Sequence, residues 1–588
     1  MAETVGDYLL RRLAQWGVRR IYGYPGEGIN GLLGAFGRGG SGIEFVPARH
    51  EELAAFMACA HAKFSGEVGV CLAASGPGAI HLLNGLYDAR LDRQPVLAIV
   101  GQHRQAGSAP PEIDLRSLFD DLAHELVHVA TTPQELPQLI DRAMLQARDE
   151  RTVCCLIVPS ELQEMPAAGQ EAQAAPLEGI GPIGRSIVAA DAELRRAAEI
   201  LNLGERVALL VGAGALDASG EIIAVAERLG AGIAKSLAGK AAVPDDLPYV
   251  TGIVGLLGSK PSWDLLERCD TLLMIGAGLS YAEFLATERQ ARGVQIDPDP
   301  RLLSPGMEVG LVGDSRTTLA ALLPYLEHKA ERRFRQQVER DVARWWQVLD
   351  LRAMAEAEPI NPERVFSELS PRLPENCIVT CDAGSCAHWF ARNLRLRRGM
   401  SAALSGGRSR MGSAVPYAIA AKYAQPHRPV IALLGDGAMQ MNGINGLITI
   451  SQLWREWANP RLTIMVLNNG ESNDAGWEQR VLDGEPLAEA PAQPEFPYAA
   501  YAELIGLRGL RVDHAEAVAP AWAAALGGDI PTVLEMVTDP RVAPLPPHIA
   551  PQQARAYLAA LRHGDSAALG IVRASARDWW DGIVAGRH

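Results

Sequence analysis

The sequence has no uninterrupted apolar segment long enough to cross a membrane, which takes about 20 residues. Its first residues, M-A-E-T-V-G-D-Y-L-L-R-R, are acidic and then amphipathic, whereas a signal peptide begins basic and continues apolar. Only eight cysteines occur in 588 residues, and Cys377, Cys381 and Cys386 lack the paired C-x-x-C spacing of zinc sites. We therefore expect buried free thiols and a cytoplasmic location.

Positive charge is also scarce, with 55 Lys and Arg against 69 Asp and Glu and a formal net charge of −14. No Lys- or Arg-rich run offsets this balance, which argues against a nucleic-acid partner. The proportions of hydrophobic (48%) and charged (21%) residues are those of an ordinary globular protein. A chain of 588 residues is too long for one core, so several domains are expected.

Strand-like apolar runs alternate with helical segments, and Gly-rich turns follow the strands, as in V-G-V-C-L-A-A-S-G-P-G-A-I-H at 68–81. This alternation predicts an α/β fold of doubly wound parallel sheets. An Ala/Gln/Pro-rich linker after Pro159 and a charged helical stretch between Leu326 and Glu358 separate three such units. The predicted domains are 1–165, 190–328 and 355–545, followed by a helical tail at 546–588.

Polar residues follow two apolar runs in the last of these domains. V-I-A-L-L stops at Gly435-Asp436-Gly437, and L-T-I-M-V-L stops at Asn468-Asn469. As a strand, a crossover helix and a strand, the pattern puts Asp436 and Asn469 at the carboxyl ends of parallel strands, where open α/β sheets bind ligands.

A divalent cation at this edge would find one carboxylate and one amide oxygen. Backbone N–H groups of Gly437 and Ala438, at the start of the crossover helix, could hold a diphosphate. The alternative is an ordinary βαβ unit with polar loop ends, and the G-D-G triplet alone does not decide between them.

Glu51 stands out in the first domain, at the start of a small-residue helix that follows the strand I-E-F-V-P. An acidic residue in a first helical turn is most often a solvated charge that complements the helix dipole. Here Ala54, Ala55 and Ala58 form a small apolar face beside it. A dry pocket of this kind would raise the pKa of a carboxyl group, as general acid–base catalysis requires.

Together these motifs give the chain a resemblance to the thiamine-diphosphate-dependent enzymes of the acetolactate synthase and pyruvate oxidase group. G-D-G followed by N-N resembles the family's diphosphate motif, and R-H-E-E its activating glutamate segment. S-G-P-G-A-I-H-L-L-N-G-L-Y-D-A at 75–89 looks like the helix behind that glutamate. The three motifs occur in the family's order, and the likeness is strongest to flavin-containing pyruvate oxidases.

The resemblance implies roles for particular residues. Glu51 matches the glutamate that hydrogen-bonds N1′ of the aminopyrimidine, so that the 4′-imino group removes the C2 proton of the thiazolium. Met411 matches the side chain that bends the cofactor, although it can equally be a core methionine. Substrate-facing candidates are Tyr24, His81, Asn473 and Glu478.

By the same resemblance, Mg²⁺ would be bound by Asp436, Asn469 and the backbone carbonyl of Glu471. Further residues expected to contact thiamine diphosphate are Pro25, Gly26, Pro77, Asn84, Asp382, Gly384, Ser385, Met411, Gly435, Gly437 and Ala438. In the family one subunit supplies the glutamate and its partner the diphosphate anchor. A homodimer is therefore the expected minimum, and a homotetramer is common.

Glycine turns also follow strands in the central domain, where G-A-G can cradle a phosphate or admit a dinucleotide. Many family members keep this domain without a ligand. T-G-I-V-G-L-L-G at 251–258 and G-A-G-L-S-Y-A-E-F at 276–284 nevertheless resemble flavin-contacting segments and favour FAD. The expected FAD contacts are Gly212, Thr251, Gly252, Gly276, Gly278, Asp297 and Asp314.

Two departures from the family pattern bear on the reaction. The spacing between G-D-G and N-N is longer than usual, and the extra residues around W-R-E-W-A-N-P lengthen either the crossover helix or its exit loop. Where the family commonly has a glutamine that reaches the reacting centre, this chain has Pro111, which offers no side-chain hydrogen bond. The second departure makes a substrate other than pyruvate, or a weakened reaction, credible.

In the predicted tail, Leu569, Val572, Ala576 and Ile583 fall at helical spacing. A helix packed on the subunit's own surface is the simpler interpretation, and a peripheral membrane contact, as in quinone-reducing pyruvate oxidases, is the alternative.

The sequence as a whole predicts decarboxylation of a pyruvate-like 2-oxo acid through a C2 ylid and an enamine, oxidative if FAD takes the electrons. A carboligase or C–C-cleaving enzyme with structural FAD is the first alternative. A non-catalytic relative is the second, and the joint presence of Glu51, Asp436 and Asn469 argues against it.

Overall fold

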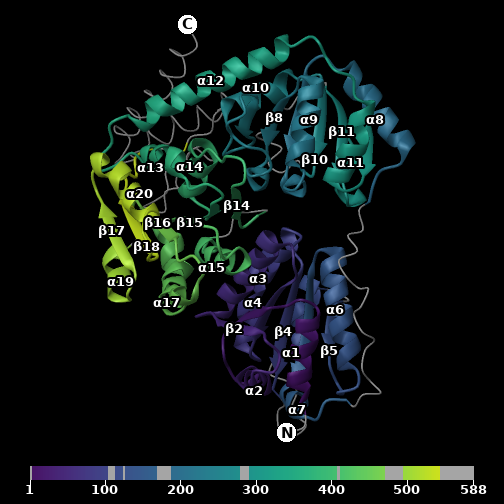
Figure 1. Ribbon diagram of the computed structural model, residues 1–588, viewed down its shortest axis with the longest axis vertical. Coiled ribbons are helices and arrows are strands. Elements are labelled where there is room, and N and C mark those ends of the chain that lie inside the picture. The colour runs from purple at the N-terminus through teal and green to yellow at the C-terminus, as the bar shows by residue number, and fades with distance from the viewer. Residues whose placement is uncertain are drawn as a thin grey trace, which may run out of the picture.

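The computed structural model contains three parallel six-stranded sheets in chain order, which confirms the predicted α/β fold (Figure 1). The structure describes residues 3–103, 113–123, 126–168, 187–278, 291–406, 411–470, 494–542 and 544. The predicted tail at 546–588 lies outside these residues, and the predicted domain boundaries stay predictions.

The N-terminal sheet has the strand order β2-β1-β3-β4-β6-β5. Its strands are β1 (Arg20–Gly23), β2 (Glu44–Pro47), β3 (Gly69–Ala73), β4 (Val96–Gln102), β5 (Val127–Val129) and β6 (Val153–Pro159). The helices around it are α1 (Val5–Gln15), α2 (Asn30–Arg38), α3 (Glu51–Ser65), α4 (Pro77–Leu91), α5 (Leu115–Ala123), α6 (Leu136–Glu150) and α7 (Ser160–Glu164). The helix expected near His50-Glu51 thus begins at Glu51.

The central sheet has the order β12-β11-β10-β7-β8-β9. Its strands are β7 (Val207–Val211), β8 (Gly232–Lys235), β9 (Val250–Ile253), β10 (Thr271–Ile275), β11 (Arg292–Asp297) and β12 (Val309–Val312). Its helices are α8 (Asp191–Leu203), α9 (Ser219–Leu229), α10 (Lys260–Arg268) and α11 (Ser315–Leu322). The long α12 (Arg333–Ala353) then runs from the central to the C-terminal domain (Figure 1).

The C-terminal sheet has the order β14-β13-β15-β16-β18-β17. Its strands are β13 (Ile378–Cys381), β14 (Ser401–Leu404), β15 (Val430–Gly435), β16 (Leu462–Asn468), β17 (Arg508–Val512) and β18 (Thr532–Val537). Its helices are α13 (Pro362–Leu369), α14 (Ser385–Asn393), α15 (Ala414–Ala424), α16 (Asp436–Ala438), α17 (Ile444–Leu453), α19 (Tyr498–Leu504) and α20 (Val518–Leu526).

The residues that lengthen the spacing between G-D-G and N-N lie in the crossover between β15 and β16. A π-helical turn (Met439–Gly443) joins α16 to α17, and a short 3-10 turn (Trp454–Glu456) follows α17. The W-R-E-W-A-N-P residues therefore lie in the 3-10 turn and the exit loop, not in a longer α-helix. π-helical turns of this kind occur frequently at functional sites.

The cores explain why these elements pack as layers. The inner strands are buried along almost their whole length, as expected for parallel sheets covered by helices on both faces. The outer strands β2, β14 and β17 are only partly buried. One core cluster contains residues of both α3 and α15, so the N- and C-terminal domains share buried apolar surface. In Figure 1 these two helices lie side by side.

All eight cysteines are buried and free of disulfide bonds, as the sequence predicted. No helix within the described residues combines the length and apolar character that crossing a membrane requires.

Candidate functional site

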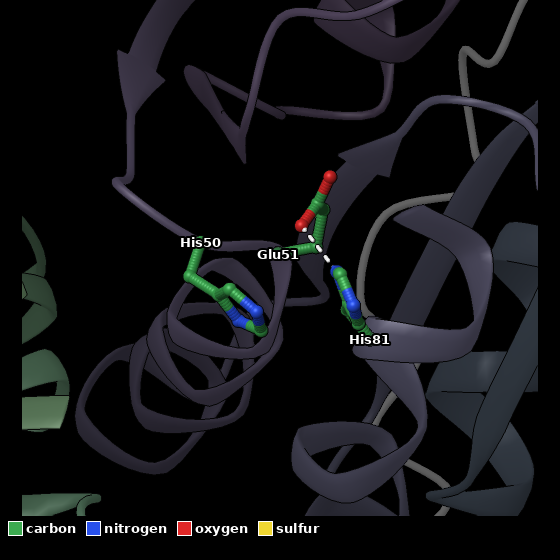
Figure 2. Close-up of side chains that lie close together, drawn as sticks. All are labelled: His50, Glu51 and His81. Atoms are coloured by element: carbon green, nitrogen blue, oxygen red, sulfur yellow. Dashed lines mark hydrogen bonds and ion pairs between the residues drawn. The ribbon is translucent and has the colours of Figure 1, made fainter. Parts of the chain in front are cut away.

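Glu51 is the first residue of α3 and is only 7% exposed, so it is not the solvated helix-end charge that its position alone suggests. His50 caps the helix, and its Nδ1 accepts a hydrogen bond from the backbone N–H of Glu52 at 3.3 Å. The carboxylate of Glu51 points away from the helix, toward the start of α4 (Figure 2).

His81 of α4 holds this carboxylate. The distance between its Nδ1 and Oε2 of Glu51 is 3.0 Å, and its ring stacks on His50 with centroids 4.4 Å apart and planes at 28°. Gly78 leaves room for the other carboxylate oxygen, because a Cβ there would lie 2.8 Å from Oε1. The rotamer of Glu51 is thus set from two sides. His81, predicted to face the substrate, bonds to Glu51, and its role toward a substrate stays a prediction.

His50, Glu51 and His81 place three possible ligand atoms within 4.8 Å of one another. The two imidazole planes are nearly parallel, however, so their in-plane lone pairs do not converge on one point. A metal ion needs such convergence from its histidine ligands. We therefore interpret the group as a hydrogen-bonded carboxylate rather than as a metal centre.

The predicted cation site lies in the C-terminal domain. Gly435 of β15 pairs with Leu467 of β16, so Asp436 and Asn469 follow neighbouring strands at one sheet edge. Asp436 is 5% exposed, and its Oδ1 and Oδ2 accept from the backbone N–H of Gly437 and Gly470, each at 2.8 Å.

Burial raises the pKa of the Asp436 carboxyl, although these backbone donors act in the opposite direction. A buried carboxylate that is held above its usual pKa by burial would be stabilised by a divalent cation. Asp436 therefore fits Mg²⁺ as a ligand, with Asn469 beside it. Glu471, the third predicted ligand, lies outside the described residues, as do Pro111, Asn473 and Glu478.

Asp382 follows β13 at the same edge. Its Oδ1 accepts two hydrogen bonds at 3.0 Å, from the backbone N–H and the hydroxyl of Ser413. Its Oδ2 is buried and has no hydrogen-bond partner among the described residues, and burial raises the pKa of this carboxyl to about 6. Two residues further, Gly384 adopts a φ of +87° and caps α14, which begins at Ser385.

These features fit a diphosphate group at this sheet edge. The Gly437 amide already donates to Oδ1 of Asp436, and the Ala438 amide beside it lies at the start of α16, where a helix can bind an anion. The unpartnered Oδ2 of Asp382 is free to donate a hydrogen bond to a phosphate oxygen when it is protonated. Met411, the predicted wedge, is 38% exposed.

Sequence reasoning missed Tyr498, which supports this edge from α19. Its hydroxyl accepts from Nε2 of Gln440 at 2.8 Å and lies 3.4 Å from the backbone oxygen of Asp436. Gln440 sits in the π-helical turn. No local signal marks Tyr498, because it reaches Asp436 from 62 residues away.

Most of the predicted FAD contacts in the central domain have structural roles of their own. A Cβ on Gly212 would lie 2.2 Å from the backbone oxygen of Gly276, so these two turns need glycine to approach each other. Thr251 donates its hydroxyl to the backbone oxygen of Ile233, and Gly252 has a φ of +108° beside Ser259.

The two acidic candidates also bond within the domain. Oδ1 of Asp297 accepts from the backbone N–H of Asp299 at 3.0 Å. Asp314 caps α11 by accepting from the N–H of Thr317 at 3.1 Å. Only Gly278 has open space around its Cβ position. The pattern is compatible with a dinucleotide, but each feature exists without one.

The remaining candidates lie around the N-terminal sheet edge. Tyr24 is 39% exposed, and a Cβ on Gly26 would lie 2.8 Å from Ala74 in the turn that leads to Pro77. Asn84 donates to Oε1 of Glu52 at 2.5 Å. Within the described residues Glu51 bonds only to its own domain, so the two halves of the site are not joined by a hydrogen bond in one chain.

Comparisons with known proteins agree with this arrangement. The thiamine pyrophosphate enzyme N-terminal, central and C-terminal domains match residues 3–124, 194–322 and 382–536. A Bacillus subtilis protein described as thiamine pyrophosphate-containing is 32% identical over 562 residues, covering 94% of this chain and 95% of that protein.

Two further relatives carry named activities. Pyruvate oxidase of Lactiplantibacillus plantarum is 30% identical over 74% of this chain and 73% of its own length. The acetolactate synthase isozyme 2 large subunit of Escherichia coli is 29% identical over 91% of this chain and 95% of its own length. With all three domain models matched in order, the chain belongs to the thiamine-pyrophosphate-dependent 2-oxo acid enzymes.

Proposed function

We propose that this enzyme decarboxylates a pyruvate-like 2-oxo acid and passes the electrons to FAD. The observation that carries the proposal is the buried, oriented carboxylate of Glu51 in the N-terminal domain, together with the buried Asp436 of the C-terminal domain. When bound, thiamine diphosphate supplies a nucleophilic thiazolium carbon that attacks the 2-oxo carbonyl and stabilises the charge left by CO₂.

Glu51 has the role of holding a proton at N1′ of the aminopyrimidine. Its burial keeps water from competing for the carboxylate, and His81 and Gly78 restrict its rotamer. A charge-assisted hydrogen bond in such a site is stronger than one in water.

Asp436 and Asn469 would hold Mg²⁺, which would neutralise the negative charge of the diphosphate. The start of α16 contributes N–H groups to the same anion, and Ser385 opens a second helix nearby. These residues would orient the diphosphate end of the cofactor.

FAD is supported by the pyruvate oxidase relative and by glycine turns at the ends of β7 and β10. The acetolactate synthase relatives favour a second candidate, carbon–carbon bond formation, in which FAD would be structural. Pro111 removes the glutamine that the family commonly has at this point, so a 2-oxo acid other than pyruvate is part of the proposal.

The test is an absorption spectrum of the purified protein, followed by anaerobic addition of pyruvate and other 2-oxo acids. Bleaching of a flavin spectrum with release of CO₂ supports the oxidase. CO₂ release with an unbleached flavin and a new carbon–carbon bonded product supports the carboligase. Absence of CO₂ release with every 2-oxo acid, in protein loaded with thiamine diphosphate and Mg²⁺, contradicts both.

We also propose that the active unit is a homodimer or a homotetramer of such dimers. The support is that, within the described residues, no hydrogen bond joins Glu51 to Asp382 or Asp436 in one chain, and a second copy can bring the two halves of the site together.

A further inference from the structure

A cluster of charged and hydroxyl side chains joins the N- and C-terminal domains away from Glu51. Lys63, near the end of α3, contacts the Asp92 carboxylate and donates to the Tyr417 hydroxyl at 2.8 Å and to the backbone oxygen of Leu404 at 2.9 Å. Side-chain exposures of 11% for Lys63 and 13% for Asp92 show that little of this pair meets solvent.

Two carboxylates of the N-terminal domain bind the chain just after β14. Oδ1 of Asp88 accepts from the Ser405 hydroxyl at 2.6 Å, and Oδ2 of Asp92 accepts from the backbone N–H of Gly406 at 2.9 Å. The Tyr417 hydroxyl donates to the other oxygen of Asp88. Asp92 thus contacts the Lys63 ammonium directly, and Asp88 is linked to it through the Tyr417 hydroxyl. These bonds offset the cost of burying the two carboxylates.

Gly406 fits against Asp92 because it has no side chain. A Cβ there would lie 1.7 Å from Oδ1 of Asp92, a distance that no side chain tolerates. The contact therefore explains a glycine at 406 by close approach to a residue 314 positions earlier in the chain. We call Lys63, Asp88, Asp92, Ser405 and Gly406 the interdomain clamp.

Two residues just before α15 have contacts of their own. Asp382 accepts from Ser413, and Gly412 adopts a φ of +89° against Asn442, where a Cβ would lie 2.8 Å from Nδ2. Met411 stands beside this second attachment. The part of the chain that carries Met411 is thus bound by buried carboxylates from two different domains.

We infer that the interdomain clamp fixes the positions of Ser405 and Gly406 and, together with the Asp382–Ser413 contact, the position of Met411, which by the family resemblance would bend bound thiamine diphosphate. Asp92 and Lys63 are then positioning residues for the reaction. The inference rests on the proposed function for its effect on the cofactor, but the attachment itself is a contact between two domains.

The helix α3 contains both Glu51 and Lys63, so it links the thiamine site to the interdomain clamp. Glu51 is its first residue and Lys63 its thirteenth, about 18 Å apart at 1.5 Å per residue. The same helix therefore carries Glu51 at its first residue and, near its other end, Lys63, which donates hydrogen bonds to the C-terminal domain.

The first test measures amide hydrogen exchange in residues 401–416 of the full-length, cofactor-free protein. Asp92→Asn is expected to speed exchange at Gly406 and its neighbours about tenfold or more, as loss of a hydrogen bond to a charged group predicts. Asp141→Asn is the matched control, because Asp141 pairs with the buried Arg12 inside the N-terminal domain and contacts neither Ser405 nor Gly406. Unchanged exchange in Asp92→Asn overturns the inference.

The second test measures the dissociation constant of thiamine diphosphate with Mg²⁺. Asp92→Asn is expected to weaken binding about tenfold, and Asp141→Asn is expected to leave it unchanged even where it lowers the melting temperature equally. Equal affinities of wild type and Asp92→Asn overturn the effect on the cofactor. Failure of the wild type to bind overturns the proposed function instead, and the exchange test still decides the attachment.

If Asp92→Asn folds poorly, a double-mutant cycle separates the Asp92–Gly406 contact from a general loss of stability. Gly406→Ala is expected to speed exchange in the wild type, because its Cβ collides with the Asp92 carboxylate. In an Asp92→Ala background the same change is expected to add nothing, since the colliding atoms are gone. An equal effect of Gly406→Ala in both backgrounds contradicts the geometry.

Discussion

The imidazole of His81 and the carboxylate of Glu51 form a hydrogen bond of 3.0 Å across the α3–α4 packing (Figure 2). The bond leaves Oε1 of Glu51 on the side of Gly78. The carboxylate is therefore ordered before any cofactor binds. Binding then loses no conformational entropy of this side chain.

Glu51→Gln should remove the carboxylate that holds the N1′ proton while it keeps the size of the side chain. The exchange rate of the C2 proton in bound thiamine diphosphate is expected to fall by about 10²–10⁴, the usual contribution of such a group. Exchange is followed by NMR after acid quenching. Glu52→Gln, in the same first helical turn, is the control and should retain the wild-type rate.

Gly78→Ala should separate activity from stability. A Cβ would meet Oε1 of Glu51 at 2.8 Å, and because this atom ends a flexible side chain, the carboxylate moves while the fold tolerates the change. C2 proton exchange is expected to slow by at least about tenfold, although Ala in a helix stabilises by about 0.5–1 kcal/mol relative to Gly.

Gly37→Ala is the matched control for this change. Gly37 is an exposed helical glycine of the same domain, with nothing within 4 Å of its Cβ position. It should show the gain in melting temperature and an unchanged exchange rate. An active Gly78→Ala variant would show that the position of Oε1 is unimportant.

A mixture of two inactive variants tests whether the site forms between subunits. Glu51→Gln lacks one half and Asp436→Ala the other, so a mixed dimer contains one intact site if the halves come from different chains. After joint refolding or co-expression, about a quarter of the wild-type activity is expected from random pairing in a twofold dimer. A site built within one chain would give no recovery at all.

The pH dependence of the protein's stability should show the titration of the Asp382 carboxyl. Burial raises its pKa to about 6 from 3.8, so the folded protein binds this proton more tightly than the unfolded chain. Its contribution is fully present below about pH 4 and is lost as the pH rises through 6, a difference on the order of 3 kcal/mol.

Thermal denaturation of the cofactor-free protein between pH 4 and 7 measures this effect. Asp382→Asn cannot titrate, so the wild type should lose melting temperature relative to this variant as the pH rises. A constant difference between the two proteins across this range would show that Asp382 stays ionised throughout.

Short-range patterns were enough to predict the fold and the start of α3. Each strand is an apolar run that ends at a polar or glycine turn, and each helix begins within a few residues of that turn, so both signals lie within about ten residues. The position of Asp436 and Asn469 at one sheet edge follows from the same local logic.

Local patterns could not predict the contacts that orient the site. Tyr498 supports Asp436 across 62 residues, and Asp92 binds Gly406 across 314. In the sequence Gly406 looks like an ordinary loop glycine. A glycine is needed there because a Cβ would collide with Oδ1 of Asp92, which belongs to another domain.

The sequence by itself determined three parallel sheets and the candidate carboxylates Glu51 and Asp436, because hydrophobic periodicity and turn chemistry act between near neighbours. The family resemblance added Asp382. Only the tertiary structure decided what holds each carboxylate: His81 for Glu51, Ser413 for Asp382 and backbone amides for Asp436. The physical reason is that hydrogen bonds are specific in direction and distance, and only the folded chain sets both.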